Sequence, residues 1–440
     1  MALNNKDRAI LVGVFMKNGF QRFRERGYRW LLRGVAKRAL AELAWLSLLP
    51  FALALHLLGY RRLFVHNEHI GHLAGDLDCF VKEQRLGLLP ERRWFALGPG
   101  SRIANQHILA NEHLLSCWQA HISVVTQPLA CAVLDLMTRR YLARHDLSHY
   151  QATFFGTQDV YRVNRLWGER PPILTLSAED EEWAKGAMAD LGLPPGGWFV
   201  CVHAREGGFL PHAEPVQSHR NATIAETIPA MREIVRRGGW CVRMGDPSMQ
   251  QLPDIEGVID YAHHQAKSAR LDIVLCAKAR FFLGCASGLS CVSVAFGVPV
   301  AQANMIPVAS LGIRICDISI PKLIWSNSLC RYLRFDEILG SDIGGYFFSH
   351  QYRQAGLRVD ENSADDILDL VREMLDRIAG RFVETAEDVA RQRSYMSLLR
   401  PGANSYGAAS RIGSAFLRRH ADLLIEPCDL KSPLPDSGGS

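Results

Sequence analysis

An apolar segment that ends in a histidine and an arginine is the strongest chemical signal in this chain. The segment begins at Trp198, reaches His203 and Arg205, and is bounded by Pro194–Gly197 in front and by two glycines behind. Such a run is typical of a buried parallel strand, and open α/β sheets bind ligands at the carboxyl ends of their strands. A guanidinium can hold a phosphate through two parallel hydrogen bonds. We therefore expect Arg205 to recognise a phosphate group.

A second arginine stands near the end of the next apolar segment. Arg243 belongs to the strand expected over residues 240–244. Two arginines over one sheet edge would neutralise a diphosphate and stabilise it as it leaves. Arg243 has a structural interpretation as well, as the ion-pair partner of Asp246 or Asp260.

A serine-glycine turn follows a third strand. The strand expected over residues 281–284 ends at Gly284, and Ser287 and Gly288 precede a helix. Free backbone N–H groups and a hydroxyl at a helix start can hold phosphate oxygens, although Ser287 could also be a simple N-cap.

Three residues near these strand ends have open roles. His203 could be a general base or could donate a hydrogen bond to a phosphate. We favour a third role, in which the backbone locks the His203 ring and the ring orients Arg205, since the two residues share one face of a strand. Glu206 could pair with an arginine or act as a base. Asp272, near the start of a helix, could receive ribose or base hydroxyls or could compensate the helix dipole.

A polar loop between a strand and a helix supplies further candidates. It runs from His66 to His72, and Glu68, His69 and His72 could serve as a base or bind an acceptor. A turn at residues 98–101 has weak anion-binding potential.

The alternation of apolar segments and amphipathic segments predicts an α/β protein of several domains. We expect strands over 62–65, 93–97, 121–125, 198–203, 240–244, 258–261, 281–284 and 298–301. Helices are expected over 70–82, 177–191, 223–237, 271–279, 290–296, 362–378 and 409–424. The predicted parts are a basic and apolar helical segment (1–60), a Rossmann-like domain (61–195), a second one (196–395), and a terminal helix with a loose tail (396–440). No GxGxxG fingerprint is present, so a tightly wrapped dinucleotide is not expected.

Composition narrows the class of protein. The chain has 440 residues, 48% of them hydrophobic and 22% charged, which is typical of a globular protein, and its net charge of +5 gives no reason to expect nucleic acid as a partner. Eleven cysteines occur singly, without a CxxC pair or a regular Cys/His spacing. This pattern argues against a zinc site and a disulfide framework and favours a reducing cytoplasm.

The first sixty residues differ from the rest. Ten lysines and arginines lie between Lys6 and Arg38, and the segment from Ala39 to Tyr60 is apolar except for three residues and contains Pro50. We favour a segment that lies on an anionic membrane surface, since Glu42 and Pro50 make it a poor span. The alternative is a pair of helices packed on the catalytic body.

The ordered motifs of the second domain resemble those of a bacterial family of glycosyltransferases, and more distantly those of the α-1,6- and peptide-O-fucosyltransferase group. The resemblance is carried by His203-x-Arg205, Arg220-Asn221, Arg243-Met-Gly-Asp246-Pro247, Asp260-Tyr261, Asp272, Phe282-Leu-Gly284-x-x-Ser287-Gly288, Phe296-Gly297-x-Pro299 and Asn304-x-x-Pro307, with Asn362-Ser363-x-x-Asp366 as a later echo.

This resemblance implies a GT-B-type enzyme, in which two Rossmann-like domains face each other across a cleft and no metal is obligatory. It implies that Arg205 binds the β-phosphate of the donor, that Ser287 and Gly288 bind phosphate, and that Asp272 contacts the nucleoside. The residues after Arg205 depart from the fucosyltransferase pattern, so the motif predicts the leaving group rather than the sugar.

The predicted function is transfer of a hexosyl or deoxyhexosyl group from a nucleoside-diphosphate sugar to a glycan or lipid-linked acceptor, in bacterial surface polysaccharide synthesis. No cofactor is expected, and the enzyme is expected at the inner face of the cytoplasmic membrane. Two alternatives are a nucleotide-sugar 2-epimerase of the same architecture and a non-catalytic scaffold that binds a nucleotide sugar at the membrane.

Overall fold

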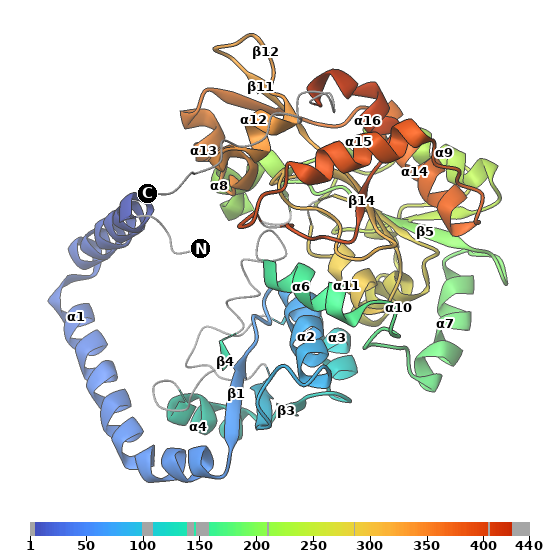
Figure 1. Ribbon diagram of the computed structural model, residues 1–440. Helices are drawn as coiled ribbons and strands as arrows, with labels where there is room; N and C mark the ends of the chain where they lie inside the picture. The colour runs from blue at the N-terminus through green and yellow to red at the C-terminus, as the bar shows by residue number, and fades with distance from the viewer. Residues whose placement is uncertain are drawn as a thin grey trace, which may run out of the picture. The chain divides into compact units, whose positions relative to one another are not determined.

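The computed structural model describes residues 5–98, 109–138, 145–146, 158–208, 211–285, 287–403 and 405–424 (Figure 1). The chain divides into two compact units. Unit 1 takes in residues 1–65, 91–108 and 122–146, and unit 2 takes in 66–90, 109–121 and 147–440. The domain boundaries expected at residues 195 and 395 stay a prediction.

Unit 1 is built on a four-stranded parallel sheet. Its order is β3 (Ser123–Val125), β2 (Arg93–Leu97), β1 (Tyr60–Phe64) and β4 (His145–Asp146). The helix α4 (Pro128–Thr138) is tied to β1 because Arg62, almost fully buried, donates to Asp135 at 2.7 Å and to Thr138 at 2.9 Å. The expected strands over 62–65, 93–97 and 121–125 are confirmed to within a few residues.

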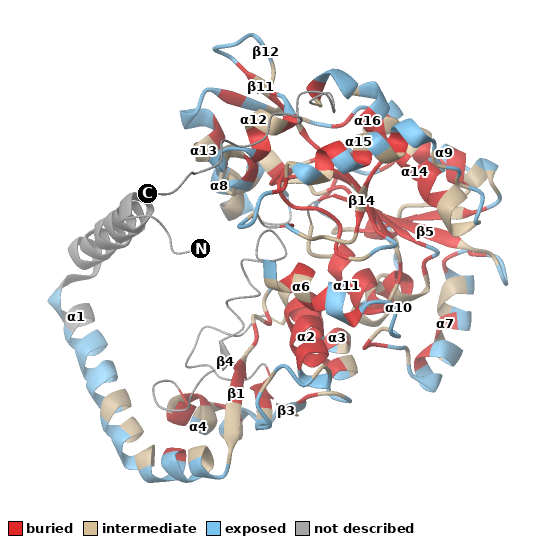
Figure 2. Cartoon of the chain, viewed as in Figure 1, coloured by how far each residue is buried: buried red, intermediate tan, exposed pale blue. Residues whose placement is uncertain are grey.

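The first helix of unit 1 is long and largely uncovered. The helix α1 (Asn5–Leu57) continues through Pro50. Its side chains are exposed along much of the described length, as Figure 2 shows, with Leu40 at 65%, Phe51 at 64% and Leu57 at 85% exposure. The alternative expected a pair of helices, whereas α1 is one helix, and only 6% of its most apolar window is buried. Contact of this helix with a membrane stays a prediction.

Unit 2 contains a seven-stranded sheet whose strands are all parallel. Its order is β14-β10-β9-β8-β5-β6-β7. The strands are β5 (Phe199–Val202), β6 (Trp240–Arg243), β7 (Val258–Ile259), β8 (Phe282–Gly284), β9 (Val300–Met305), β10 (Ile318–Pro321) and β14 (Arg411–Ile412). The mixed α/β class with parallel sheets is confirmed. The central strands are fully buried because helices cover both faces, which explains their unbroken apolar sequence.

Two groups of helices cover this sheet, one on each face (Figure 1). One face carries α9 (Ile228–Arg236), α14 (Ala364–Ile378), α15 (Ala386–Ser397) and α16 (Ser414–Arg419). The other face carries α10 (Ala269–Lys278) and α11 (Ser290–Ala295). Around these pack α2 (Ile70–Arg85), α3 (Glu112–Trp118), α6 (Gln158–Trp167) and α7 (Ala178–Asp190).

A small antiparallel sheet that the sequence did not predict completes unit 2. It has the order β12 (Arg331–Tyr332), β11 (Leu323–Ser326) and β13 (Leu357–Asp360). Two short helices, α12 (Phe335–Leu339) and α13 (Ser349–Gln354), lie between β12 and β13 in the sequence. A third short helix, α8 (Glu214–Gln217), lies in the loop after β5.

Capping explains which helix predictions succeed. Ser177 caps α7 and Ser363 caps α14, in each case by accepting a hydrogen bond from the N–H three residues on. The helix expected over 223–237 is two elements, since a 3₁₀ turn precedes α9. The helix expected over 409–424 is wrong, because residues 411–412 pair with β10 as β14 and α16 forms only afterwards, on α14 and α15.

Candidate functional site

The order of the strands in unit 2 defines a switch point between β5 and β8. The chain moves from β5 outward through β6 to β7, and it then returns to place β8 on the other side of β5. In open α/β sheets ligands bind in the crevice outside the carboxyl ends of the strands at this point. The two loops are joined there, because the N–H of Arg205 donates to Sγ of Cys285 at 3.1 Å and that of His203 to the carbonyl of Leu283 at 2.9 Å.

Arg205 lies at this switch point with its guanidinium held from one side. Its side chain is 12% exposed, and Nη1 donates to the Asn221 side chain, to Glu214 at 3.3 Å and to the carbonyl of Gln217 at 3.5 Å. The loop that carries α8 therefore holds the Arg205 side chain in place through contacts within the protein. A fixed guanidinium at a switch point suits recognition of a phosphate.

Two more cations and a neutral histidine surround Arg205. Arg220 and Lys322 are both more than nine-tenths buried, and Nζ of Lys322 donates to the carbonyl of Asn221 at 2.5 Å. Burial and the charge of Arg205 lower the pKa of Arg220 to about 10, and burial lowers the pKa of Lys322. Burial and the neighbouring cations lower the pKa of His219 to about 3.

This basic cluster, Arg205, Arg220 and Lys322, has an electrostatic consequence. Glu214 is the carboxylate paired with Arg205, and its side chain is 27% exposed. Crowded cations at low exposure repel each other, so an anion bound among them would be favoured. Sequence reasoning named Arg205 and Arg220 but missed Lys322, which stands between the apolar segments of β10 and β11 and carries no motif.

Arg243 forms ion pairs instead of projecting toward a ligand. Its side chain is fully buried, Nη1 lies 2.9 Å from Asp260, Nη2 lies 3.2 Å from Glu206, and Nη2 also donates to the carbonyl of Gln250 at 2.9 Å. The ion-pair interpretation is therefore the one that the structure favours. A joint grip of Arg205 and Arg243 on one diphosphate stays a prediction, and in the structure the guanidinium of Arg243 is paired with two carboxylates.

The carboxylates around Arg243 are likewise engaged. Glu206 also accepts from the N–H of Gln250 at 2.7 Å, so it acts as a partner of an arginine and not as a free base. Burial raises the pKa of Asp260, but the N–H of Leu252 and the guanidinium outweigh this and keep its pKa below the usual value. Asp246 accepts from the N–H of Ser248 at 2.9 Å, a local turn contact.

His203 is a buried, neutral imidazole at the switch point. It is 6% exposed, and burial together with Arg243 and Arg205 lowers its pKa to about 3. Its Nδ1 has no hydrogen-bond partner among the described residues. The expectation that the backbone locks this ring is therefore not met at Nδ1, and the ring is not protonated near neutral pH.

The turn after β8 differs from the expected helix cap. The N-cap of α11 is Leu289, no side chain caps the helix, and α11 has only six residues. Ser287 and Gly288 are half-buried and lie in the turn between Gly284 and α11. The cap interpretation of Ser287 is wrong, which leaves its hydroxyl outside the helix.

Asp272 lies in the first turn of α10 and is paired. Lys267 lies 2.9 Å from its carboxylate, and the ammonium also lies 4.7 Å from the centre of the Tyr261 ring. Asp272 is 22% exposed. A contact between Asp272 and a nucleoside stays a prediction.

The histidine loop of residues 66–72 lies beside the turn at Ser287 and Gly288. Gly71, at the start of α2, is so close to Gly288 that a Cβ at position 71 would lie 2.7 Å from the Cα of Gly288. Both belong to unit 2. The sequence predicted these two segments for separate domains, and nothing in the sequence signalled that they touch.

Within this loop the acidic and basic groups are paired. His66 lies 3.1 Å from Glu68, and this hydrogen bond lowers the pKa of Glu68 to about 2, which makes Glu68 a poor base. Nδ1 of His72 lies 3.2 Å from Asp76. His69 is surface-exposed, and its ring lies 5.8 Å from that of His72.

Asn304 supports the backbone. It has a left-handed conformation with φ of 55°, its side chain accepts from the N–H of Asn362 at 2.8 Å, and its own N–H donates to the Asn362 side chain at 2.5 Å. Two motif segments far apart in the sequence are thus joined by a pair of hydrogen bonds.

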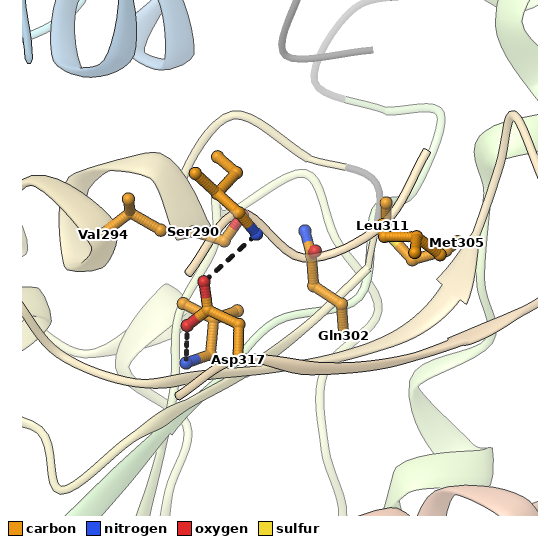
Figure 3. Close-up of a pocket in the computed structure, with 8 residues that line it drawn as sticks. Ser290, Val294, Gln302, Met305, Leu311 and Asp317 are labelled. Atoms are coloured by element: carbon orange, nitrogen blue, oxygen red, sulfur yellow. Dashed lines mark hydrogen bonds between the residues drawn. The ribbon is translucent and has the colours of Figure 1, made fainter. Parts of the chain in front are cut away.

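A small pocket elsewhere in unit 2 is lined by none of the predicted site residues. Gln302 and Asp317 lie among apolar side chains of α11, β9 and the following loop, as Figure 3 shows. Asp317 accepts from the N–H groups of Val300 at 3.0 Å and Ile313 at 3.2 Å and pairs with Arg314. Its carboxylate is satisfied, so the pocket does not compete with the switch point as a ligand site.

No cluster of three or more histidines, cysteines or acidic residues suited to a metal ion occurs in the part of the chain that the structure describes. Metal independence stays a prediction. Most of the 98–101 turn lies outside the described residues.

Comparison with known proteins gives distant likenesses. No protein-family profile and no curated protein matches this chain. Among solved structures, the glycosyl transferase family 9 protein from Veillonella parvula is similar at 11% identity and a TM-score of 0.30, over 55% of this chain and 79% of the other. ADP-heptose LPS heptosyltransferase II from E. coli is similar at 10% identity and 0.30, over 55% and 83%. E. coli heptosyltransferase WaaC with ADP is similar at 11% and 0.27, over 59% and 90%. The resemblance to the fucosyltransferase group stays a prediction.

Proposed function

We propose that this protein is a glycosyltransferase that moves a sugar from a nucleoside-diphosphate donor to a glycan or lipid-linked acceptor. The observation that supports it most is the position of Arg205: a guanidinium fixed by Glu214 and Asn221, at the switch point between β5 and β8. The proposed donor site combines Arg205, Arg220 and Lys322 with the turn at Ser287 and Gly288.

In the proposed reaction the basic cluster binds the diphosphate. As the bond between the anomeric carbon and the diphosphate breaks, negative charge grows on the leaving oxygen, and buried cations that are already in place stabilise it without reorganisation. The chemistry of the proposal therefore depends on Arg205, with Lys322 as a second phosphate ligand. Arg243 pairs with Glu206 and Asp260 and is not a phosphate ligand in this proposal.

We also propose that α1 attaches the enzyme to a membrane. The segment Leu32–Leu57 is long and apolar enough, by length and composition, to cross a bilayer. Unlike a core helix, this segment is exposed, and the basic residues that precede it suit anionic lipid.

The donor site is tested with purified full-length protein and a panel of UDP, GDP, CMP and dTDP sugars in a thermal-shift assay, with and without a chelator. We expect one nucleoside diphosphate to raise Tm, and Arg205→Ala to abolish the shift. Arg358→Ala is the matched control, since Arg358 is an arginine with 58% side-chain exposure that also pairs with a carboxylate.

Three results of the same panel would contradict the proposal. Stabilisation by no nucleotide would remove the donor site. An unchanged shift in Arg205→Ala would place it elsewhere. Consumption of the donor with formation of an epimerised nucleotide sugar, and no need for an acceptor, would favour the 2-epimerase.

A further inference from the structure

We propose that His72 and Asp76 form a catalytic dyad, in which His72 is the base that deprotonates the acceptor hydroxyl and Asp76 positions it. This inference rests on the proposed function and adds its missing base. Nδ1 of His72 lies 3.2 Å and 3.4 Å from the two carboxylate oxygens of Asp76, one helical turn further along α2. A carboxylate at Nδ1 fixes the tautomer that leaves a lone pair on Nε2.

The exposure of the two side chains fits these roles. Asp76 is 1% exposed, whereas His72 is 23% exposed. Ordinary helix-surface pairs are solvated on both sides and are worth little. Here the carboxylate is buried and the imidazole retains access to solvent, so a substrate hydroxyl can approach the ring.

The pair also lies next to the proposed donor turn. Gly71, the residue before His72, meets Gly288 backbone to backbone. The helix α2, which carries both residues, packs on α11, the helix that follows that turn. The dyad and the turn at Ser287 and Gly288 therefore border the same part of unit 2.

The helix that carries the dyad is held in place by buried polar contacts. Lys82 of α2 donates to Asp78 at 2.5 Å and to Asn164 of α6 at 2.8 Å, and all three side chains are buried. A base on a fixed helix meets the positional accuracy that proton transfer requires.

The step balances as a direct displacement. The acceptor oxygen forms a bond to the anomeric carbon while its proton passes to Nε2 of His72. The bond from that carbon to the diphosphate breaks, and its electron pair leaves on the diphosphate oxygen. The proposal therefore requires inversion at the anomeric carbon.

Other ionisable groups also face His72. The rings of His66 and His69 lie 5.9 Å and 5.8 Å from its ring, Glu68 pairs with His66, and the charge of Asp76 adds to burial in raising the pKa of the Cys291 thiol in α11. A pH profile of turnover must therefore be compared among variants and not assigned from one curve.

The first test measures release of nucleotide from the sugar nucleotide that stabilises the protein, with water as acceptor. We expect His72→Gln to lower kcat by a factor of 10² to 10⁴ and to leave the thermal shift by nucleotide unchanged, as a base but not a ligand would. Asp76→Asn should lower kcat and change the pH profile. His121→Gln is the control, a partly buried histidine that hydrogen-bonds Arg85.

The second test does not need a donor. In protein labelled with ¹⁵N-histidine, the His72 signals, assigned with His72→Gln, should report a proton on Nδ1, and Asp76→Asn should shift the tautomer balance. A proton on Nε2 instead would overturn the dyad.

The outcomes separate the two proposals. Turnover at the wild-type rate in His72→Gln, or a product with retained configuration, would overturn the dyad alone. Absence of any stabilising nucleotide in the wild type would overturn the donor site, and the dyad with it.

Discussion

Gly71 and Gly288 meet backbone to backbone where α2 packs on the turn before α11. A Cβ at position 71 would lie 2.7 Å from the Cα of Gly288, and a Cβ at position 288 would lie 2.8 Å from the nitrogen of Gly71. The neighbouring atoms are backbone, which cannot rotate away. Glycine is required at both positions because the two segments approach more closely than side chains allow.

The close approach predicts that Gly71→Ala and Gly288→Ala destabilise the fold. We expect each to cost about 1–3 kcal/mol in the free energy of unfolding, since the added methyl group must displace backbone. Gly186→Ala is the control: it lies within α7 with open space around it, so it should stabilise by about 0.5–1 kcal/mol. Urea unfolding measures all three, and equal effects at positions 71 and 186 would contradict the packing.

The ion pairs of Arg243 predict a large loss of stability on its removal. Arg243→Met should cost about 3–5 kcal/mol, because Glu206 and Asp260 lose the cation that faces them at low exposure. Arg358→Met, at a side chain with 58% exposure, should change stability by less than about 1 kcal/mol. A small effect of Arg243→Met in urea unfolding would return Arg243 to the list of candidate ligands.

His203 predicts a specific dependence of stability on pH. Its pKa falls to about 3 in the folded protein, whereas an unfolded histidine titrates near pH 6.5, so the unfolded state binds more protons between these values. The contribution of the neutral His203 ring to the free energy of unfolding is fully present above about pH 6.5. It is lost as the pH falls toward 3, by up to about 1.4 kcal/mol per pH unit. Urea unfolding at pH 7, 6 and 5 should show a shallower slope in His203→Gln, and parallel slopes would contradict the burial of a neutral ring.

Removal of the Lys322 ammonium should have opposite effects on the stability of the free protein and on its affinity for the ligand. Lys322→Met removes a buried cation near Arg205 and Arg220, so the free protein should be as stable or more stable. Affinity for the nucleoside diphosphate should fall about tenfold or more, since a charge-assisted hydrogen bond is worth about 1.5–3 kcal/mol. Calorimetry and urea unfolding measure the two effects, with Lys185→Met as an exposed control. Unchanged affinity would exclude Lys322 from the site.

The exposed apolar surface of α1 predicts binding to anionic membranes. The full-length protein should float with vesicles that contain phosphatidylglycerol, and changing Arg33, Lys37 and Arg38 together to glutamate should reduce this binding. Changing Leu40 and Leu43, both more than 60% exposed, to serine should weaken binding to neutral vesicles too. Flotation independent of all these changes would contradict a role for α1.

The sequence determined the local elements well where one physical cause dominated. The strands at 199–202 and 240–243 follow from unbroken apolar runs, and Ser177 and Ser363 marked helix starts because a cap is decided within four residues. The prediction of one helix over residues 409–424 was wrong because residues 411–412 pair with β10, and this tertiary contact overrides helix propensity.

The sequence by itself also determined that Arg205 would stand at the carboxyl end of a buried strand, since an apolar run followed by glycines allows little else. Only the tertiary structure decided which arginine is neutralised and which residues join the site. Arg243 meets Glu206 and Asp260, Lys322 reaches Asn221, and His72 meets Asp76 beside Gly288. Charge pairing depends on distances of about 3 Å between residues that can be far apart in the chain, and those distances are set by how the strands are ordered in the sheet and how the helices pack on it.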